Sequence, residues 1–155
     1  MRKVIFLLIV ILSLPTNLWA ADPIIGTWKL NVAKSTGTEG KDSPAKEIIW
    51  VYRETDSGLI EIEQKRVFMD GTSDSSVSTF PAQGGAHLLQ DIEGMFLIEV
   101  YLSPGEWCGV YIEDGKQVVT RHKIVSDDGK TLTQTIRAID DGDVPVEIIS
   151  VFDRQ

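Results

Sequence analysis

The chain has 155 residues, of which 43% are hydrophobic and 25% charged, and its formal net charge is −8 at pH 7. This acidic balance argues against nucleic acid and anionic lipid surfaces as partners, because both are bound through clustered Lys and Arg. Cys108 is the single cysteine, so no disulfide forms within the chain and packing must stabilise the fold.

The first twenty residues have the layout of a secretory signal peptide. A basic start precedes the apolar run Val4–Leu14, which is too short to span a bilayer comfortably, and Ala20 or Ala21 offers a small residue at the cleavage point. We therefore expect residues 1–20 to be removed. Residues 21–155 should then form one exported domain, periplasmic or secreted, that is not embedded in a membrane. An uncleaved anchor is the alternative.

Turn signals divide the remainder of the chain into short segments of alternating hydrophobicity. Asp-Gly, Gly-Gly and Pro-Gly pairs recur at short intervals, and Asp-Gly favours tight hairpins because both residues tolerate positive φ. The signals predict strands over residues 24–30, 46–54, 59–69, 73–82, 86–92, 95–103, 106–113, 117–126, 131–140 and 144–153. Evenly spaced hairpins indicate an all-β fold, a single antiparallel up-and-down β-barrel of about 8–10 strands.

The segment Asn31–Ala45 interrupts this rhythm. It is long, polar and rich in Ser, Thr, Gly and Lys, and Asn31 is placed to cap a single helical turn through Ser35. It has no apolar stripe that a helical lid would bury. We therefore expect a barrel without a helical lid and a flexible rim loop over its open end.

Strand alternation assigns an inner face once Trp28 is taken to point inward beside Gly26. The inward apolar positions predicted on this parity are Ile24, Leu30, Ile48, Trp50, Tyr52, Ile60, Ile62, Phe68, Phe96, Ile98, Val100, Leu102, Cys108, Val110, Ile112, Val118, Ile124, Leu132, Ile136, Ala138, Val144, Val146, Ile148 and Phe152.

The same parity turns several polar side chains inward, namely Gln64, Arg66, Thr120, His122, Gln134 and Ser150. Buried polar groups need hydrogen-bond partners. Two interpretations remain open. One is a pocket with an apolar wall and a polar end that suits an amphipathic ligand. The other is a filled interior in which these groups and trapped water satisfy one another.

Motifs that carry chemistry are few. The two histidines, His87 and His122, lack short metal-ligand spacing, although a zinc or haem site could be drawn through His122. Asp140–Asp143 fits a hairpin turn better than a calcium loop. No inward carboxylate is expected in a well-patterned strand, and no nucleophile, phosphate or dinucleotide motif is present. We expect no enzyme activity, no metal and no cofactor.

Both ends of the mature chain carry a family resemblance. The run Gly26–Ser35 (GTWKLNVAKS) and the ending Val151–Gln155 (VFDRQ) resemble a family of small exported bacterial lipocalin-like proteins. The Gly-x-Trp opening is also similar to that of the lipocalin and fatty-acid-binding-protein group. The resemblance implies a calycin-type β-barrel without a defined molecular function. Fatty-acid-binding proteins hold the ligand carboxylate partly through Arg and Tyr on the last strand, where this chain has Ser150 and Phe152. A fatty-acid site is therefore not implied unless Arg66 substitutes.

The leading functional hypothesis is non-catalytic binding or carriage of a small apolar or amphipathic molecule inside the barrel. The candidate ligand-binding residues are Trp28, Trp50, Tyr52, Gln64, Arg66, His122, Gln134 and Ser150. The alternative is a protein-interaction module, an envelope inhibitor or adaptor, that uses the Asn31–Ala45 loop and the aromatics Trp107 and Tyr111, which fall on the outward parity. The sequence names neither the ligand nor the oligomeric state.

Overall fold

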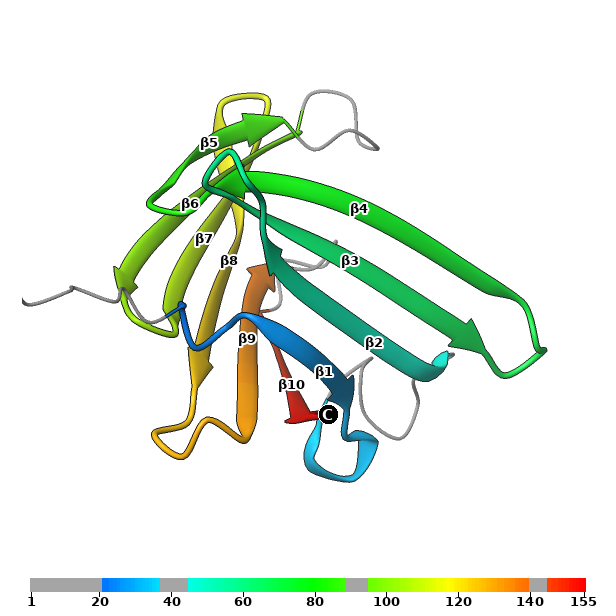
Figure 1. Ribbon diagram of the computed structural model, residues 1–155. Helices are drawn as coiled ribbons and strands as arrows, with labels where there is room; N and C mark the ends of the chain where they lie inside the picture. Colours follow the sequence, from blue (N-terminus) through cyan, green and yellow to red (C-terminus); the bar gives the residue numbers. More distant parts are fainter. Residues whose placement is uncertain (1–20, 37–44, 89–94, 140–144) are drawn as a thin grey trace, which may run out of the picture.

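Ten antiparallel strands form a nearly closed β-barrel (Figure 1). The computed structural model describes residues 21–36, 45–88, 95–139 and 145–155. The strands are β1 (Gly26–Leu30), β2 (Ala45–Glu54), β3 (Leu59–Phe68), β4 (Ser73–Pro81), β5 (Gly84–Leu88), β6 (Met95–Ser103), β7 (Glu106–Glu113), β8 (Lys116–Val125), β9 (Thr131–Ile139) and β10 (Pro145–Arg154). Consecutive strands pair except β4 and β5, which stand at the two ends of the strand order, and β10 pairs with β1. The predicted all-β up-and-down barrel is confirmed.

The tight turn between β7 and β8 shows why Asp-Gly pairs mark the hairpins. Asp114 and Gly115 have φ angles of 50° and 75°. A type I′ turn requires positive φ at both central positions, and its twist matches that of the flanking strands. The turn signals at Glu93–Gly94 and Asp141–Gly142, and the acidic run Asp140–Asp143, lie outside the described residues.

A short 3-10 helix, η1 (Val32–Lys34), follows β1. Asn31 caps it as predicted, because its Oδ1 accepts a hydrogen bond from the Lys34 backbone N–H at 3.1 Å. The Ser35 hydroxyl then accepts from the backbone N–H of Val151 in β10 at 3.0 Å. Residues 37–44 of the expected rim loop lie outside the described part of the chain. Within the part that is described, no helix is long and apolar enough to cross a membrane.

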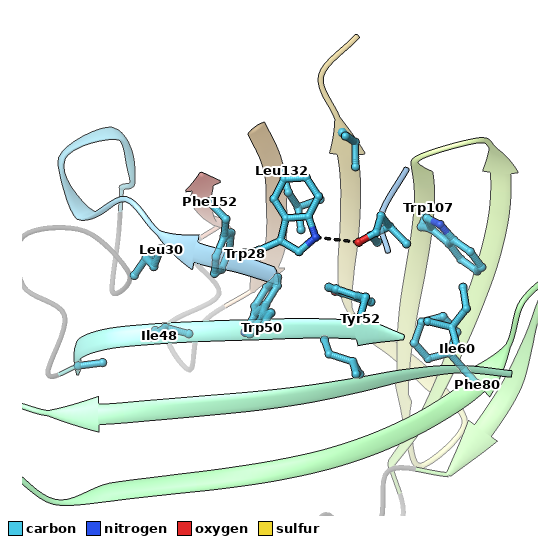
Figure 2. Packing of buried hydrophobic residues seen from close by; sticks show 14 residues of the cluster. Trp28, Leu30, Ile48, Trp50, Tyr52, Ile60, Phe80, Trp107, Leu132 and Phe152 are labelled. Carbon is cyan, nitrogen blue, oxygen red and sulfur yellow. Dashed lines mark hydrogen bonds between the residues drawn. The ribbon is translucent and has the colours of Figure 1, made fainter. Parts of the chain in front are cut away.

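The hydrophobic core fills the end of the barrel at which β1 begins. Trp28 is fully buried, and its Nε1 donates a hydrogen bond to the Ile24 carbonyl oxygen at 2.7 Å (Figure 2). The rings of Trp50 and Phe152 pack beside it with centroids 4.0 Å apart. Burial confirms the predicted core positions Ile24, Trp28, Leu30, Ile48, Trp50, Tyr52, Ile60, Ile62, Leu132 and Phe152. Val144 lies outside the described residues.

Arg154 joins three segments at this packed end. Its guanidinium lies 4.1 Å from the centroid of the Trp28 ring. It also donates hydrogen bonds to three backbone carbonyl oxygens, those of Pro23, Ile25 and Gly129. A Cβ on Gly26 would collide with Arg154 Nη1, and the φ of Gly26 is +140°. The glycine beside Trp28 therefore makes room for a charged side chain from the last strand.

The predicted inner face is wrong for β6, β7 and β8. Leu97, Glu99 and Trp107 are 2%, 1% and 1% exposed, whereas Phe96 and Val100 are 45% and 42% exposed. The residues that were predicted to point inward on these strands point outward, namely Phe96, Ile98, Val100, Leu102, Cys108, Val110, Ile112, Val118, Thr120, His122 and Ile124. Both faces of these strands carry apolar residues, so alternation alone does not choose between them.

Trp107 supplies the physical reason for this reversal. Its ring contacts Phe80 of β4 at 5.4 Å and Tyr101 of β6 at 5.1 Å between centroids. Burying an indole removes far more apolar area from water than burying Cys108 on the other face. Because paired residues share a face, the inward Trp107 orients β6 and β8 as well.

Replacing Arg154 with Ala should lower the free energy of unfolding by about 2–4 kcal/mol, because a cation–π contact and charge-assisted hydrogen bonds are lost. Urea denaturation measures the change. The matched control is Arg137→Ala, which removes an exposed pair with Glu147 and should change stability by less than about 0.5 kcal/mol. Equal effects of the two substitutions would contradict the role given to Arg154.

Candidate functional site

Three charged side chains meet inside the barrel. Glu99 of β6 forms ion pairs with Arg121 and Lys123 of β8, and both cations contact the same carboxylate oxygen, Oε1. The Lys123 Nζ lies 3.4 Å from that oxygen, and Arg121 Nη2 makes a closer contact. The exposed fractions of the three side chains are 0% for Glu99, 11% for Arg121 and 3% for Lys123. Two cations thus share one carboxylate away from bulk water. We call these three residues the interior charge cluster.

Gly109 of β7 gives the interior charge cluster its space. It pairs with Glu99 on one side and with Arg121 on the other. A Cβ at this position would lie 2.7 Å from Arg121 Cγ and Nε and 3.1 Å from Glu99 Oε2. The missing side chain therefore lets Arg121 reach across β7 to the carboxylate.

Aromatic rings surround the two cations. Arg121 Nη1 donates a hydrogen bond to the Tyr111 hydroxyl at 2.7 Å, and its guanidinium carbon lies 5.3 Å from the centre of that ring. The Lys123 Nζ lies 5.5 Å from the Tyr52 ring centre and 5.8 Å from that of Phe80. Tyr52 and Phe80 come from the opposite side of the barrel, from β2 and β4. The rings stabilise positive charge through their electron-rich faces.

Several buried polar atoms in and around this cluster have no hydrogen-bond partner. They are Glu99 Oε2, Arg121 Nε, Trp107 Nε1, Tyr52 Oη and Ser150 Oγ. An unsatisfied buried polar group costs about 1–3 kcal/mol, so native structures keep few of them. Five such atoms in one barrel are the pattern expected of a site that awaits a polar group or ordered water.

Burial changes the proton affinities at the site. It lowers the pKa of Arg121 to about 10, so this guanidinium stays charged at neutral pH. Burial, reinforced by the Arg121 charge, holds the pKa of Lys123 well below its ordinary value. Burial raises the pKa of Tyr111 to about 12 and raises that of Tyr52, which the nearby Arg121 charge partly opposes. Both phenols therefore remain neutral hydrogen-bond donors.

Apolar side chains continue the inner face toward the end opposite the packed core. The inward residues there are Val119, Ile136, Ala138, Val146 and Ile148, which are all half-buried. Inward residues at the core end, such as Leu132 and Phe152, are fully buried. The described side chains therefore fill one half of the barrel and leave an apolar wall accessible in the other. The interior charge cluster lies between the two halves.

A partly open pocket of about 640 Å³ lies at the rim of the packed end, among the turns that follow β2, β4 and β6. Its apolar lining includes Ile25, Ile60, Ala82 and Tyr101, and Asp22 and Glu54 contribute carboxylates. The Tyr101 ring, which lines this pocket, packs on Trp107, and Trp107 in turn packs on Phe80.

The structure brings most of the predicted ligand-binding residues to the inner face. Trp28, Trp50, Tyr52, Gln134 and Ser150 are inward and buried. Gln134 pairs with both Lys123 and Ser150 across the strands, so it connects the interior charge cluster to β10. Gln64 pairs with Trp50 and is half-buried. A ligand-binding role for these residues stays a prediction.

Two predicted residues lie elsewhere. His122 is on the outer face, 39% exposed at its side chain, and contacts Glu106 Oε1 at 3.0 Å. It is excluded from the interior because its neighbours Arg121 and Lys123 point inward. Arg66 is half-exposed near the far end of β3 and forms a two-point ion pair with Asp74 of β4. Neither side chain joins the interior charge cluster.

Sequence reasoning missed Glu99, Arg121 and Lys123 because it gave their strands the wrong inner face. It also placed Trp107 and Tyr111 on the outer face, as part of a partner surface, and both point inward. Side-chain size could have indicated the correct face, because Trp107 has a larger apolar area to bury than Cys108 or Val110 on the other face of β7. Among the described residues, no group of His, Cys, Asp and Glu is arranged to hold a metal ion.

Comparison with known proteins supports the fold. No family model and no curated protein matches the chain. The fluorescent protein UnaG is similar in structure, with 13% identity over 88% of this chain and 100% of that chain and a TM-score of 0.58. A Schistosoma mansoni fatty acid binding protein in complex with arachidonic acid has 14% identity, covers 86% of this chain and 96% of that chain, and has a TM-score of 0.58.

A zebrafish ileal bile acid-binding protein complexed with cholic acid is also similar, at 6% identity, with coverage of 86% of this chain and 99% of that chain and a TM-score of 0.51. Identities this low establish the shared architecture and nothing more. The chain has a lipocalin-like β-barrel that is similar in architecture to fatty-acid-binding proteins.

Gly109→Ala should displace Arg121 from Glu99 and lower the free energy of unfolding by about 1–3 kcal/mol through overpacking. The same substitution should cost much less in a chain that already carries Arg121→Ala, because the colliding side chain is gone. A double-mutant cycle measured by urea denaturation gives the coupling. Additive effects of the two substitutions would show that Arg121 does not need the space at Gly109 to reach Glu99.

Proposed function

We propose that the protein binds a small amphipathic anion inside its barrel without chemical turnover. The observation that carries this proposal is the interior charge cluster, in which two buried cations share one carboxylate oxygen and neighbouring donors stay unpaired. Buried charge is costly unless it is compensated. An anionic ligand supplies the missing negative charge.

The geometry assigns a role to each part of the ligand. An anionic group that enters beside Arg121 competes with Glu99 for the two cations and accepts a hydrogen bond from the unpaired Arg121 Nε. Tyr52 and Trp107 offer further unpaired donors. The apolar body lies along the half-buried inner wall of β8, β9 and β10, where it loses contact with water.

The comparisons agree with this ligand class. The similar fatty acid binding protein holds arachidonic acid and the similar bile acid-binding protein holds cholic acid, and each ligand joins a carboxyl group to an apolar body. Glu99 is already engaged by two cations, which makes it a poor general base. Binding rather than catalysis is therefore the function that these residues support.

Isothermal titration with arachidonate and cholate, each compared with its methyl ester, tests the proposal. The acid should bind at least about tenfold more tightly than the ester, because charge-assisted hydrogen bonds contribute about 1.5–3 kcal/mol. Arg121→Gln should weaken binding of the acid about 10- to 100-fold and leave the ester nearly unchanged. Glu99→Gln should strengthen it, because a competing carboxylate is removed.

The pH dependence gives an independent measure on the same ligands. An anion beside Lys123 raises the lowered pKa of that amine, so binding takes up a proton above this pKa and none below it, where Lys123 is already charged. Affinity should therefore fall as pH rises through this lowered pKa, and Lys123→Met should flatten the profile. Equal binding of acid and ester, or no binding of either probe, would sink the proposal of an interior anion site.

We also propose that the protein is exported, as a lipocalin-like protein of the bacterial envelope. The support is the basic and apolar layout of residues 1–20, together with the family-like runs at Gly26–Ser35 and Val151–Gln155. Expression of the full chain in a bacterial host should yield a periplasmic or secreted product that begins at Ala21 or Asp22 by mass spectrometry. Ile9→Asp should keep the uncut chain in the cytoplasm. A full-length product in the cytoplasm of the unmodified strain would contradict export.

A further inference from the structure

The outer face of β6 and β7 is apolar from Phe96 to Leu102 on β6 and from Cys108 to Ile112 on β7. Four outward residues of β6 are Phe96, Ile98, Val100 and Leu102, and three of β7 are Cys108, Val110 and Ile112. Phe96, Val100 and Leu102 are 45%, 42% and 50% exposed, and Ile124 of β8 continues the surface at 43%. We call these eight residues the outer apolar face. The carboxylate of Glu106 borders the face where it meets Ile124.

The barrel exterior is built differently on β2 and β3. There Arg53 contacts Glu61 at 3.1 Å and Glu63 at 2.9 Å, and Lys65 contacts Glu63 at 2.8 Å. Alternating ion pairs of this kind are what a solvated outer face requires. The outer apolar face therefore departs from the rest of the exterior, and a continuous exposed apolar patch marks an interaction surface.

We propose that the outer apolar face joins two copies of this chain in a symmetric dimer. A second copy offers an equally flat, uncharged sheet, and two antiparallel sheets pack face to face through their apolar sides about 10 Å apart. A twofold axis makes one surface its own complement. The inference is independent of the interior anion site, because it uses the opposite face of the same strands.

Charge favours a second copy over a lipid surface. The chain carries 23 acidic and 15 basic residues, and an anionic membrane repels such a protein. The edges of the outer apolar face carry both signs, with Glu106 and His122 at one end and Glu113 and Lys116 at the other. In a twofold dimer that places one end of the face against the opposite end of the second copy, charges of the same sign are therefore not brought together.

The size of the surface predicts a weak dimer. Three strands at about 4.8 Å spacing and seven residues at about 3.4 Å each give a sheet of roughly 14 Å by 24 Å, or about 340 Å² per copy. Two copies then bury about 700 Å², which is the size of a weak, transient interface. We expect self-association at concentrations on the order of hundreds of micromolar.

Sedimentation equilibrium from about 10 µM to 1 mM tests the dimer, and Cys108 supplies a second readout, because it lies within the face and is the only cysteine. A short bis-maleimide should link two copies through Cys108. Val100→Asp should weaken association at least about tenfold and abolish the cross-link, because a carboxylate would be buried without a partner. Leu102→Asp should act in the same way.

Val77→Asp is the matched control, because Val77 is 54% exposed on the outer side of β4, away from the outer apolar face. It should leave association and the cross-link unchanged. Circular dichroism melts confirm that each variant is folded, so a loss of association reports the surface itself. A monomer at every concentration would overturn the proposal, as would equal effects of Val77→Asp and Val100→Asp. A monomer that floats with phosphatidylcholine vesicles would overturn it in favour of a lipid partner.

Discussion

The shared carboxylate of Glu99 is the constraint on which the interior depends. One oxygen faces both Arg121 and Lys123, and the side chains reach it only because Gly109 leaves a gap in the strand between them. Placing three charges in an apolar enclosure costs desolvation energy, and their mutual attraction offsets only part of it. In the proposed site the excess positive charge favours an anionic ligand, and the Tyr111 hydroxyl accepts a hydrogen bond that helps to hold Arg121 in place.

The charged interior and the apolar exterior of β6–β8 have one cause. Once Trp107 is buried against Phe80, every paired residue on these strands takes its face from that choice. Glu99 and its cations turn inward, and Val100 and its apolar neighbours turn outward. The same event therefore creates a site inside the barrel and an uncovered surface outside it. The proposed ligand site and the proposed dimer surface therefore both follow from the burial of Trp107.

The barrel divides into a structural half and an accessible half. Trp28 fills the end of the barrel at which β1 begins. Its ring is covered by the Arg154 guanidinium and lies beside Trp50. The likeness to fatty-acid-binding structures extends to this architecture, but the last strand presents Ser150 and Phe152 to the interior. The positive charge inside this barrel comes from Arg121 and Lys123 of β8 and not from the last strand. The fold is thus shared with known lipid binders, while the polar end of the proposed site is assembled from other strands.

Local sequence determined the ten hairpin-linked strands, the Asn31 cap and the inward Trp28, because turn chemistry, capping and strong alternation act over a few residues. It did not determine the inner face of β6–β8, where both parities are apolar and the decision rests on Trp107 meeting Phe80 from a distant strand. Nor did it place Arg121 beside Glu99, since that contact crosses β7 through the space left by Gly109. Tertiary structure decided these points, because only the closing of the sheet into a barrel brings Trp107 to Phe80, and only the order of β6, β7 and β8 in that sheet brings Arg121 to Glu99.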